Sequence, residues 1–423
     1  MTGCDKDADV GGASATADVR RAGGTVLAGH DPGHVEEARA VVVSSAVPSD
    51  HPELVRARQL NVPVVRRAEA LAAAIEPGLG VGIAGTHGKT TTTVMTTEAL
   101  AAAGLNPTGI AGGRVSTWGG NARLGGDNLF VVEADEYDKS FLALSTQVAV
   151  INNVEPDHLE CYGTVENLED AFSRFAHPAR RVIVGSSPAA LRVARLAGRP
   201  TWTVGLGQAD VAVRVVERSA SASVAMVSLP TGRSVELRLK VPGIHNLTNA
   251  AAALAVAVEL EADLDPVLGA LEAFTGVGRR FEHVGDAAGV TVIDDYAHHE
   301  TEIAATLEAA RQAFPGRRLI AAFQPHLFSR TAEHGAEMGK ALAAADVVVI
   351  TDIYPAREAP MPGVTSAIVV DSARAAGASV QWVPDRRELA AALKKLIRRG
   401  DAVVTMGAGD ITWVGRELVG LLS

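Results

Sequence analysis

The chain has 423 residues, enough for two to four domains of ordinary size. Hydrophobic residues make up 47% and charged residues 21% of it, an ordinary globular composition that excludes a disordered or fibrous protein. Lysine and arginine number 39 against 49 aspartates and glutamates, so the formal net charge is −10. The basic surface of a general nucleic-acid binder is therefore missing, and we expect no nucleic-acid partner.

Cysteine usage and hydropathy predict the compartment. The two cysteines, Cys4 and Cys161, cannot build a disulfide framework in a chain of this size, which favours a reducing environment. The longest apolar stretch, residues 249–260, is shorter than the roughly 18–20 residues that cross a bilayer, and the first residues lack the pattern of a signal peptide. We therefore expect a cytoplasmic protein without a membrane partner.

Short apolar runs rich in β-branched residues alternate along the chain with alanine-rich stretches. Continuous runs of this kind between helices are typical of buried parallel strands in α/β layers. The runs that predict strands are Val41–Val43, Val81–Gly85, Leu129–Val132, Val148–Ile151, Val182–Val184, Val292–Ile293, Leu319–Phe323, Val347–Ile350 and Val403–Met406. Residues 211–241 break this rhythm, because alternating residues around the turn signal Leu229–Arg233 predict a small antiparallel insertion.

Two glycine-rich joints divide the pattern. One lies at Glu76–Gly80 and the other at Phe274–Gly278. Joints of this composition mark loops between periodic segments. They predict three α/β domains, at residues 1–78, 79–275 and 276–423.

The sharpest local signal is the run Gly85-Thr86-His87-Gly88-Lys89-Thr90-Thr91, which follows a predicted strand and opens an apolar helix. Its glycines permit a tight loop whose backbone N–H groups point at phosphate oxygens, and the helix adds the positive end of its dipole. In such a loop Lys89 reaches the β- and γ-phosphates and the Thr90 hydroxyl binds Mg²⁺. The spacing is shorter than in GxxxxGK[ST], and a purely structural turn is the alternative; the strand–GKT–helix context favours a phosphate site.

Polar side chains follow two further predicted strands. Glu133 and Asp135 stand at the end of the strand that starts at Leu129, and His158 follows Val148–Ile151. The carboxyl ends of parallel strands are where open α/β sheets bind ligands. A lone histidine after a strand is more often structural, but three such sites in order favour a divalent-metal shell around a triphosphate.

These motifs, in this order, resemble those of the Mur ligases, the ATP-dependent enzymes that form amide bonds in cell-wall precursor synthesis. The resemblance covers the chain from about Gly29 to its end. The matching stretches are GTHGKTTTT (85–93), EADEYDKSF (133–141), INNVEPDH (151–158), Gly243–Ala250, Gly278–Glu282, Asp294–His299, Phe323–His326, Ser329–Thr331, Asp352–Glu358 and Gly407–Asp410. The stretches that begin at Asp294 and Asp352 are more specific than the phosphate loop.

The resemblance implies a fold and an activity. The fold is a three-domain α/β Mur ligase with an incomplete Rossmann-like N-terminal domain for the UDP-sugar, a central P-loop ATPase domain with an antiparallel insertion, and a C-terminal Rossmann-like domain. The activity is ATP-dependent addition of L-alanine to UDP-N-acetylmuramate through an acyl phosphate, in peptidoglycan precursor synthesis. ATP and Mg²⁺ are the implied cofactors, and we expect a monomer or weak homodimer.

The resemblance also implies roles for individual residues. The residues implied to bind ATP are Gly85, Thr86, His87, Gly88, Lys89, Thr90 and Thr91, with His245, Asn246 and Asn249 on the adenine side and Asp295 at the ribose. The implied metal ligands are Thr90, Glu133 and His158. The implied catalytic residues are Lys89, His158, Arg279, His298, His299 and Arg330, the last four facing the muramyl carboxylate, the γ-phosphate or the incoming amino acid.

The N-terminal part departs from the pattern of the family. Mur ligases begin with a hydrophobic strand, a glycine-rich turn and a helix that hold the uridine nucleotide, whereas Met1–Asp5 looks like the end of the second strand. We therefore expect that a unit on the order of 30 residues is missing, through a late start codon or a true truncation. The expected consequence is a chain that binds ATP but handles the UDP-sugar poorly.

Two other interpretations stay open. A recycling ligase that joins a preformed tripeptide to the same sugar nucleotide shares the GTHGKT and EADEYD stretches, although Tyr296 and residues 153–158 look more like a ligase for L-alanine. A catalytically impaired nucleotide-binding relative is the second, although Lys89, Glu133 and His158 are all present. A dehydrogenase is disfavoured, because no G-x-G-x-x-G opens the first block.

Overall fold

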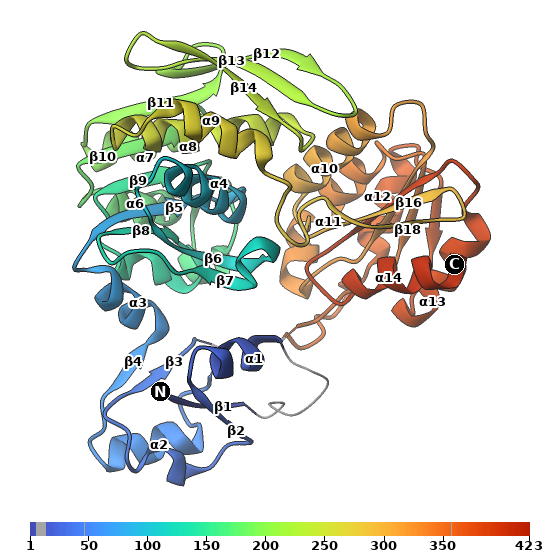
Figure 1. The fold of residues 1–423 in the computed structure, drawn as a ribbon. Coiled ribbons are helices and arrows are strands. Elements are labelled where there is room, and N and C mark those ends of the chain that lie inside the picture. Colours follow the sequence, from blue (N-terminus) through green and yellow to red (C-terminus); the bar gives the residue numbers. More distant parts are fainter. Residues whose placement is uncertain (6–13, 46, 357) are drawn as a thin grey trace. The chain divides into compact units, whose positions relative to one another are not determined.

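The computed structural model describes residues 1–5, 14–45, 47–356 and 358–423, so Arg357 of the Asp352–Glu358 motif lies outside the described residues. The chain forms two compact units, one of residues 1–89 and 104–203 and the other of residues 90–103 and 204–423 (Figure 1). Each unit alternates strands and helices, as the sequence predicted. Within the described residues, no helix is long and apolar enough to cross a membrane.

The first 77 residues carry two separate pairs of parallel strands. Strand β1 (Thr2–Asp5) pairs with β2 (Thr25–Ala28), and β3 (Val41–Val43) pairs with β4 (Val64–Arg66). The helices of this stretch are α1 (Ser14–Arg21), η1 (Pro32–Val35), α2 (Pro52–Gln59) and α3 (Arg67–Ile75). Buried hydrophobic side chains are scarce: the described ones are Val35, Leu54, Ala57 and Ile75.

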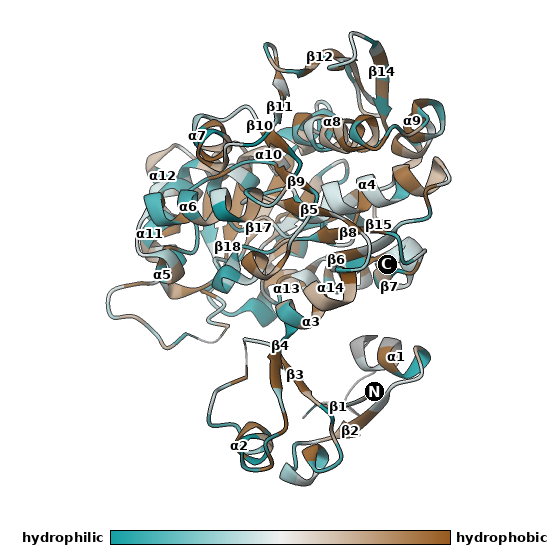
Figure 2. Cartoon of the chain, turned by 90° about the vertical axis from the view of Figure 1, so that its left-hand side faces the viewer, coloured by the Kyte–Doolittle hydropathy of each residue, from teal (hydrophilic) through white to brown (hydrophobic). Residues whose placement is uncertain are grey.

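The rest of the first unit contains the strands β10-β9-β5-β8-β6-β7, which neighbour one another in this order within a ten-stranded sheet. Its strands are β5 (Leu79–Ala84), β6 (Thr108–Val115), β7 (Gly120–Arg123), β8 (Leu129–Glu133), β9 (Val148–Ile151) and β10 (Arg181–Gly185). All neighbours run parallel except β6 and β7. Strands β5, β8 and β9 are hydrophobic along their length (Figure 2), which explains their burial on both faces.

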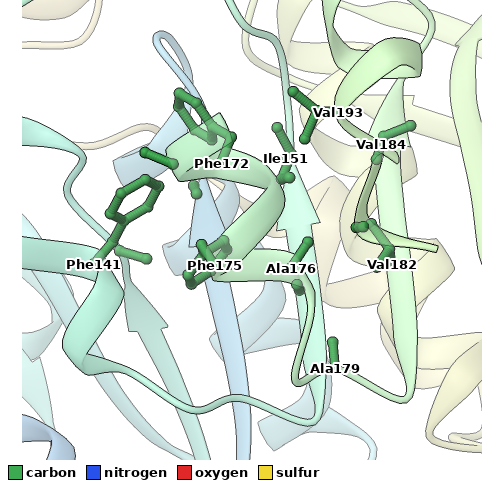
Figure 3. Packing of buried hydrophobic residues seen from close by; sticks show 14 of the residues in the cluster. Phe141, Ile151, Phe172, Phe175, Ala176, Ala179, Val182, Val184 and Val193 are labelled. Carbon is green, nitrogen blue, oxygen red and sulfur yellow. The ribbon is translucent and has the colours of Figure 1, made fainter. Parts of the chain in front are cut away.

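The core of this unit is supplied by η3 (Tyr137–Ala143), α5 (Leu159–Tyr162), α6 (Val165–Ala176) and α7 (Pro188–Ala197). Two further helices are η2 (Ser116–Trp118), which follows β6, and α4 (Lys89–Ala102), which belongs to the second unit apart from Lys89. Helix α6 starts after Thr164, whose hydroxyl accepts a hydrogen bond from the Asn167 N–H. It brings Phe172 and Phe175 against Phe141 of η3, with ring centroids 5.2 and 5.1 Å from the Phe141 ring (Figure 3).

From residue 204 onward, the second unit contains the predicted antiparallel insertion. Strand β11 (Thr201–Leu206) enters it, and β12 (Val211–Arg218), β13 (Ser223–Ser228) and β14 (Ser234–Leu239) form an antiparallel ladder, which confirms that prediction. Helices α8 (Ile244–Glu259) and α9 (Leu264–Ala273) follow. Helix α8 consists largely of alanine and valine and is buried over most of its length.

A second sheet of order β15-β16-β20-β17-β18-β19 organises the C-terminal part of this unit. Its strands are β15 (Glu282–Ala287), β16 (Val290–Asp295), β17 (Leu319–Phe323), β18 (Val347–Ile350), β19 (Val380–Trp382) and β20 (Ala402–Met406). The helices are α10 (Glu300–Ala313), α11 (Phe328–Leu342), α12 (Ala367–Ala375), α13 (Arg386–Leu396) and α14 (Thr412–Leu422). Each face of the sheet has its own hydrophobic cluster, and parallel β16, β17 and β20 bring their carboxyl ends to one edge.

Candidate active site

The phosphate loop connects the buried strand β5 to helix α4, as the sequence predicted. Gly85 and Gly88 both have positive φ angles, of 129° and 78°. A Cβ atom on Gly85 would lie 2.9 Å from the backbone nitrogen of Asn152, so only glycine fits this turn. The loop thus ends at the N-terminus of a 14-residue helix, where backbone N–H groups are available for phosphate.

The segment after β9 holds this loop in place. Asn153 accepts a hydrogen bond from the His87 N–H at 2.8 Å and donates to the His87 carbonyl at 3.3 Å. The Thr86 hydroxyl accepts from the Glu155 N–H at 2.9 Å. Sequence analysis missed these contacts, although the polar run Asn152–Glu155 at the end of a buried strand was a signal for them. The loop is therefore ordered by side chains that do not belong to the glycine motif.

Lys89 occupies the centre of the loop. Its Nζ donates to the carbonyls of Gly85 and Thr86, at 2.8 and 3.2 Å, and to Glu136 Oε1 at 2.8 Å. Burial acts to lower the pKa of Lys89, but the charges of Glu136 and Asp135 outweigh it and raise the pKa above its ordinary value. The lysine is therefore a permanent cation.

Glu136 is the carboxylate that the sequence did not single out. Burial raises its pKa, with Lys89 acting in the opposite direction. Its Oε2 is buried without a hydrogen-bond partner among the described residues, and its backbone carbonyl accepts from the Tyr162 hydroxyl. A buried carboxylate oxygen without a partner is costly. Glu136 Oε2 is therefore available to accept a hydrogen bond or to bind a cation beside the phosphate loop.

The predicted metal ligands flank the loop. Strands β8 and β9 are the two neighbours of β5; Glu133 ends β8, and His158 follows β9. The Glu133 carboxylate accepts from the Gly112 N–H, where a Cβ would clash with it at 2.6 Å. His158 lies within 3.5 Å of Glu160 and has a φ of 55°. The third, Thr90, is the second residue of α4 and is buried.

The other residues predicted to bind ATP lie at the start of α8 and at the end of β16. Asn246 donates to the Pro242 carbonyl at 2.7 Å, and Asn249 is buried one turn later. Burial lowers the pKa of His245 to about 4. Asp295 accepts from the N–H groups of Phe281 and Ala297, at 2.7 and 2.8 Å, and burial raises its pKa to about 6.

Four side chains were predicted to face the muramyl carboxylate, the γ-phosphate or the incoming amino acid. Three of them lie near His326, a residue that sequence analysis did not choose. His298, Arg330 and Arg279 act in that order, after burial, to lower the pKa of His326 to about 3. The rings of His298 and His326 are 6.1 Å apart, and Arg330 is buried in the first turn of α11. We call Arg279, His298, His326 and Arg330 the His326 cluster. His326 belonged to a matching motif, which was the available signal.

Arg279 and His299 also make contacts outside the His326 cluster. The guanidinium of Arg279 donates to the carbonyls of Gly407 and Gly409, at 2.7 and 3.2 Å. His299 caps α10, is 2% exposed, and has its ring 4.7 Å from that of His334. Arg279 thus positions the turn after β20, whereas His299 belongs to a neighbouring histidine pair.

Comparisons with known proteins identify the family of the chain. Three models of one family match successive parts of the chain: the Mur ligase family catalytic domain at residues 4–77, the Mur ligase middle domain at 83–257, and the Mur ligase glutamate ligase domain at 279–409. The chain belongs to the Mur ligase family. The three-domain α/β Mur ligase fold expected from the motifs is confirmed, while the boundaries after residues 78 and 275 stay predictions.

Relatives within the Mur ligase family are similar over most of their length. The UDP-N-acetylmuramate–L-alanine ligases of Cutibacterium acnes and Streptomyces griseus are 46% and 45% identical, over 96% of this chain and 88% and 89% of theirs. The crystal structure of the UDP-N-acetylmuramate–alanine ligase of Thermotoga maritima has a TM-score of 0.83 at 30% identity, over 99% of this chain and 92% of that one. A murein peptide ligase of Psychrobacter arcticus, at 23% identity and TM-score 0.71, shares the fold.

Proposed function

We propose that this chain is a UDP-N-acetylmuramate–L-alanine ligase, which uses ATP to form the amide bond between L-alanine and the lactyl carboxylate of the sugar nucleotide. The observation that carries the proposal is the Lys89 network on the phosphate loop, in a chain 45–46% identical over almost its whole length to relatives of that name. The recycling ligase for tripeptides is less well supported, because two solved murein peptide ligases are 23% and 25% identical to this chain, against 30% for the alanine ligase of Thermotoga maritima.

The first step activates the carboxylate. A lactyl oxygen attacks the γ-phosphorus of ATP, the bond to the β–γ bridging oxygen breaks, and ADP leaves an acyl phosphate behind. Lys89 is fixed at the N-terminus of α4 and stays protonated, so it stabilises the charge that spreads over the phosphate oxygens. Asn153 and the Thr86 hydroxyl keep the loop in this conformation.

Mg²⁺ is part of this proposal. Thr90, Glu133 and His158 are the residues that would hold it, with the vacant Oε2 of Glu136 as a further oxygen donor. Carboxylate and hydroxyl oxygens are donors that suit this ion. When bound, Mg²⁺ supplies positive charge that neutralises the phosphate oxygens.

The second step forms the amide. The amine nitrogen of L-alanine attacks the carbonyl carbon of the acyl phosphate, the bond to the phosphate oxygen breaks, and the nitrogen gives up a proton. His298 is the proposed acceptor. Its Nδ1 lies 2.9 Å from the Tyr296 carbonyl and 3.1 Å from Glu302, two acceptors that place the proton on Nδ1 and leave Nε2 free to accept. Arg330 is proposed to bind an anionic group of the substrates.

His245, Asn246, Asn249 and Asp295 are proposed to contact the nucleoside of ATP. The buried amides at the start of α8 and the ring of His245, whose pKa is lowered to about 4, offer neutral hydrogen-bonding groups, which suit an uncharged base. His299 keeps a proposed supporting role through its cap on α10. A monomer or weak homodimer in the cytoplasm stays our expectation.

The test is phosphate release by the purified chain with Mg-ATP and UDP-N-acetylmuramate, with and without L-alanine. We expect release that requires both the sugar nucleotide and L-alanine, together with formation of the UDP-N-acetylmuramoyl-alanine product. Release that requires a tripeptide instead of L-alanine would support the recycling ligase. ATP turnover that ignores every acceptor would support an impaired nucleotide-binding relative.

A further inference from the structure

The N-terminal stretch gathers five metal-ligating side chains that the proposed chemistry does not use. They come from three separate places in the fold. Cys4 lies on β1, His30 and His34 lie between β2 and the end of η1, and His51 and Glu53 lie at the start of α2. They form two groups of three, Cys4–His34–Glu53 and His30–His51–Glu53, whose ligand atoms lie within 4.8 Å of one another in each group, and Glu53 belongs to both. We call these five residues the Cys4–Glu53 cluster.

Several distances within the cluster are close to those between the ligands of one metal ion. Cys4 Sγ lies 3.1 Å from Glu53 Oε1 and 3.4 Å from His30 Nδ1. The Nδ1 atoms of His34, His30 and His51 lie 2.9, 3.5 and 3.7 Å from the nearest Glu53 oxygen. A tetrahedral zinc ion with bonds of about 2.0–2.3 Å separates its ligand atoms by roughly 3.3–3.8 Å. These separations are compatible with a shared ion after small shifts.

Burial makes the cluster unusual for a surface ion pair. The Glu53 side chain is 9% exposed and faces Cys4 and three histidines. His51 Nδ1 is buried without a hydrogen-bond partner among the described residues, and it lies on the Glu53 side of its ring. Glu53 also accepts from the Asp31 N–H. His51 Nδ1 is therefore available as a metal-ligand atom that faces the cluster.

We propose that the Cys4–Glu53 cluster binds one Zn²⁺ ion, with Cys4, His34 and Glu53 as ligands and the fourth position filled from the pair His30 and His51. Thiolate and imidazole ligands favour zinc, whereas Mg²⁺ and Ca²⁺ take oxygen ligands. Binding converts the Cys4 thiol to a thiolate and releases its proton to solvent. No part of this inference depends on the proposed ligase activity.

The site has a structural purpose in this stretch. Residues 1–77 bury few hydrophobic side chains among those described, and their strands form two separate pairs. Small folding units with a limited core commonly depend on a structural metal or a disulfide. A zinc ion would tie β1, η1 and α2 together, since each of these elements supplies a ligand. Its binding energy would then contribute to the folding of this stretch.

The experiment uses Co²⁺ as a spectroscopic substitute for zinc on the full chain. We expect the metal-free chain to develop a thiolate-to-cobalt charge-transfer band together with the intense visible bands of tetrahedral cobalt, saturating at one ion per chain. One equivalent of Zn²⁺ should abolish both. The band reports cysteine ligation only, so cobalt at an oxygen-lined Mg²⁺ site does not produce it.

Two variants locate the ligand. Cys4→Ser should lose the charge-transfer band, whereas Cys161→Ser, which removes the other cysteine, should keep it at full intensity. Hydrogen exchange of the unmodified chain gives a second measurement, in which Zn²⁺ should slow exchange in residues 1–77 and leave residues 104–203 unchanged. Absence of the band in the unmodified chain, or its retention in Cys4→Ser, would overturn the proposal and leave the cluster as a hydrogen-bond network only.

Discussion

The phosphate loop and the His326 cluster each contain a buried basic side chain, and the two side chains have opposite protonation states. In the loop, a buried lysine keeps its proton because Glu136, Asp135 and two carbonyls surround its ammonium group. In the His326 cluster, the ring gives up its proton, because burial, followed by the electrostatic effects of His298, Arg330 and Arg279, lowers its pKa to about 3.

This difference separates the two proposed tasks. A cation that anions already surround keeps its charge at every working pH, which suits a group that holds phosphate through the whole reaction. A histidine that stays neutral beside arginines does not add to their charge and leaves the guanidinium groups to contact anionic substrates. pH dependence should therefore arise in the second region and not at Lys89.

The largest expected effect comes from removing the cation of the loop. Lys89→Met should lower kcat by at least about 10²–10³-fold, because the phosphate charge loses a fixed donor in a buried site. It should also destabilise the chain by about 3–5 kcal/mol, because Glu136 becomes a buried carboxylate without its partner. Phosphate-release kinetics and urea unfolding measure the two effects.

The double variant Lys89→Met with Glu136→Gln separates catalysis from stability. Neutralising Glu136 should restore most of the lost free energy of unfolding, whereas activity should stay as low as in Lys89→Met. If activity recovered together with stability, the lysine would be a structural cation and its role at phosphate would be refuted.

The sequence predicted the loop well because its signal is local. Strand, glycines, lysine and helix start follow one another within a dozen residues, so the periodicity and the motif place them without tertiary information. The run EADE offers three carboxylates, one at the last residue of β8 and two in the irregular turn that follows. Nothing in the pattern tells which of them faces Lys89, and the structure selects Glu136, which the sequence analysis had passed over for Glu133.

Contacts between distant segments were beyond sequence reasoning. Asn153 holds His87 across 66 positions, and Cys4 meets Glu53 across 49. No periodicity encodes such pairs, because they depend on which strand ends become neighbours in the sheet. The neutral state of His326 was equally hidden, since it results from burial and from neighbouring groups on separate elements.

Removing charge from the His326 cluster should have the next largest effect. Arg330→Met should lower kcat about 10²-fold, because a buried guanidinium that stabilises developing negative charge is lost. The KM for ATP should change little if Arg330 serves the sugar or the amino acid. Lys340→Met, on the exposed face of the same helix, is the matched control and should keep normal activity. Equal activity of the two variants would contradict the assignment.

Asp295, which ends β16 and is not part of the His326 cluster, should give the C-terminal part of the chain a pH-dependent stability. Burial raises its pKa from 3.8 to about 6, so the folded chain binds this proton more tightly than the unfolded chain. The protonated carboxyl stabilises the fold below pH 3.8, and this contribution of about 3 kcal/mol is lost as pH rises through about 6.

The Asp295→Asn variant tests this sign. Its free energy of unfolding should lack the part that falls between pH 4 and pH 7, whatever constant offset the amide introduces. Asp371→Asn, at an exposed position on α12, is the control and should follow the unmodified chain. A pH profile of Asp295→Asn parallel to that of the unmodified chain would show that Asp295 is not the titrating group.

The smallest expected effect concerns the order of the phosphate loop. Asn153→Ala removes both hydrogen bonds to the His87 backbone but leaves Lys89, Glu136 and the glycines in place. The loop then has to be ordered by ATP itself, which should raise the KM for ATP on the order of tenfold, or about 1.4 kcal/mol, with little change in kcat. Asn167→Ala, which removes an asparagine from α6 away from the loop, should leave that KM unchanged. An unchanged KM in Asn153→Ala would mean that the glycines and Lys89 order the loop alone, and the loop would then be as locally determined as its motif.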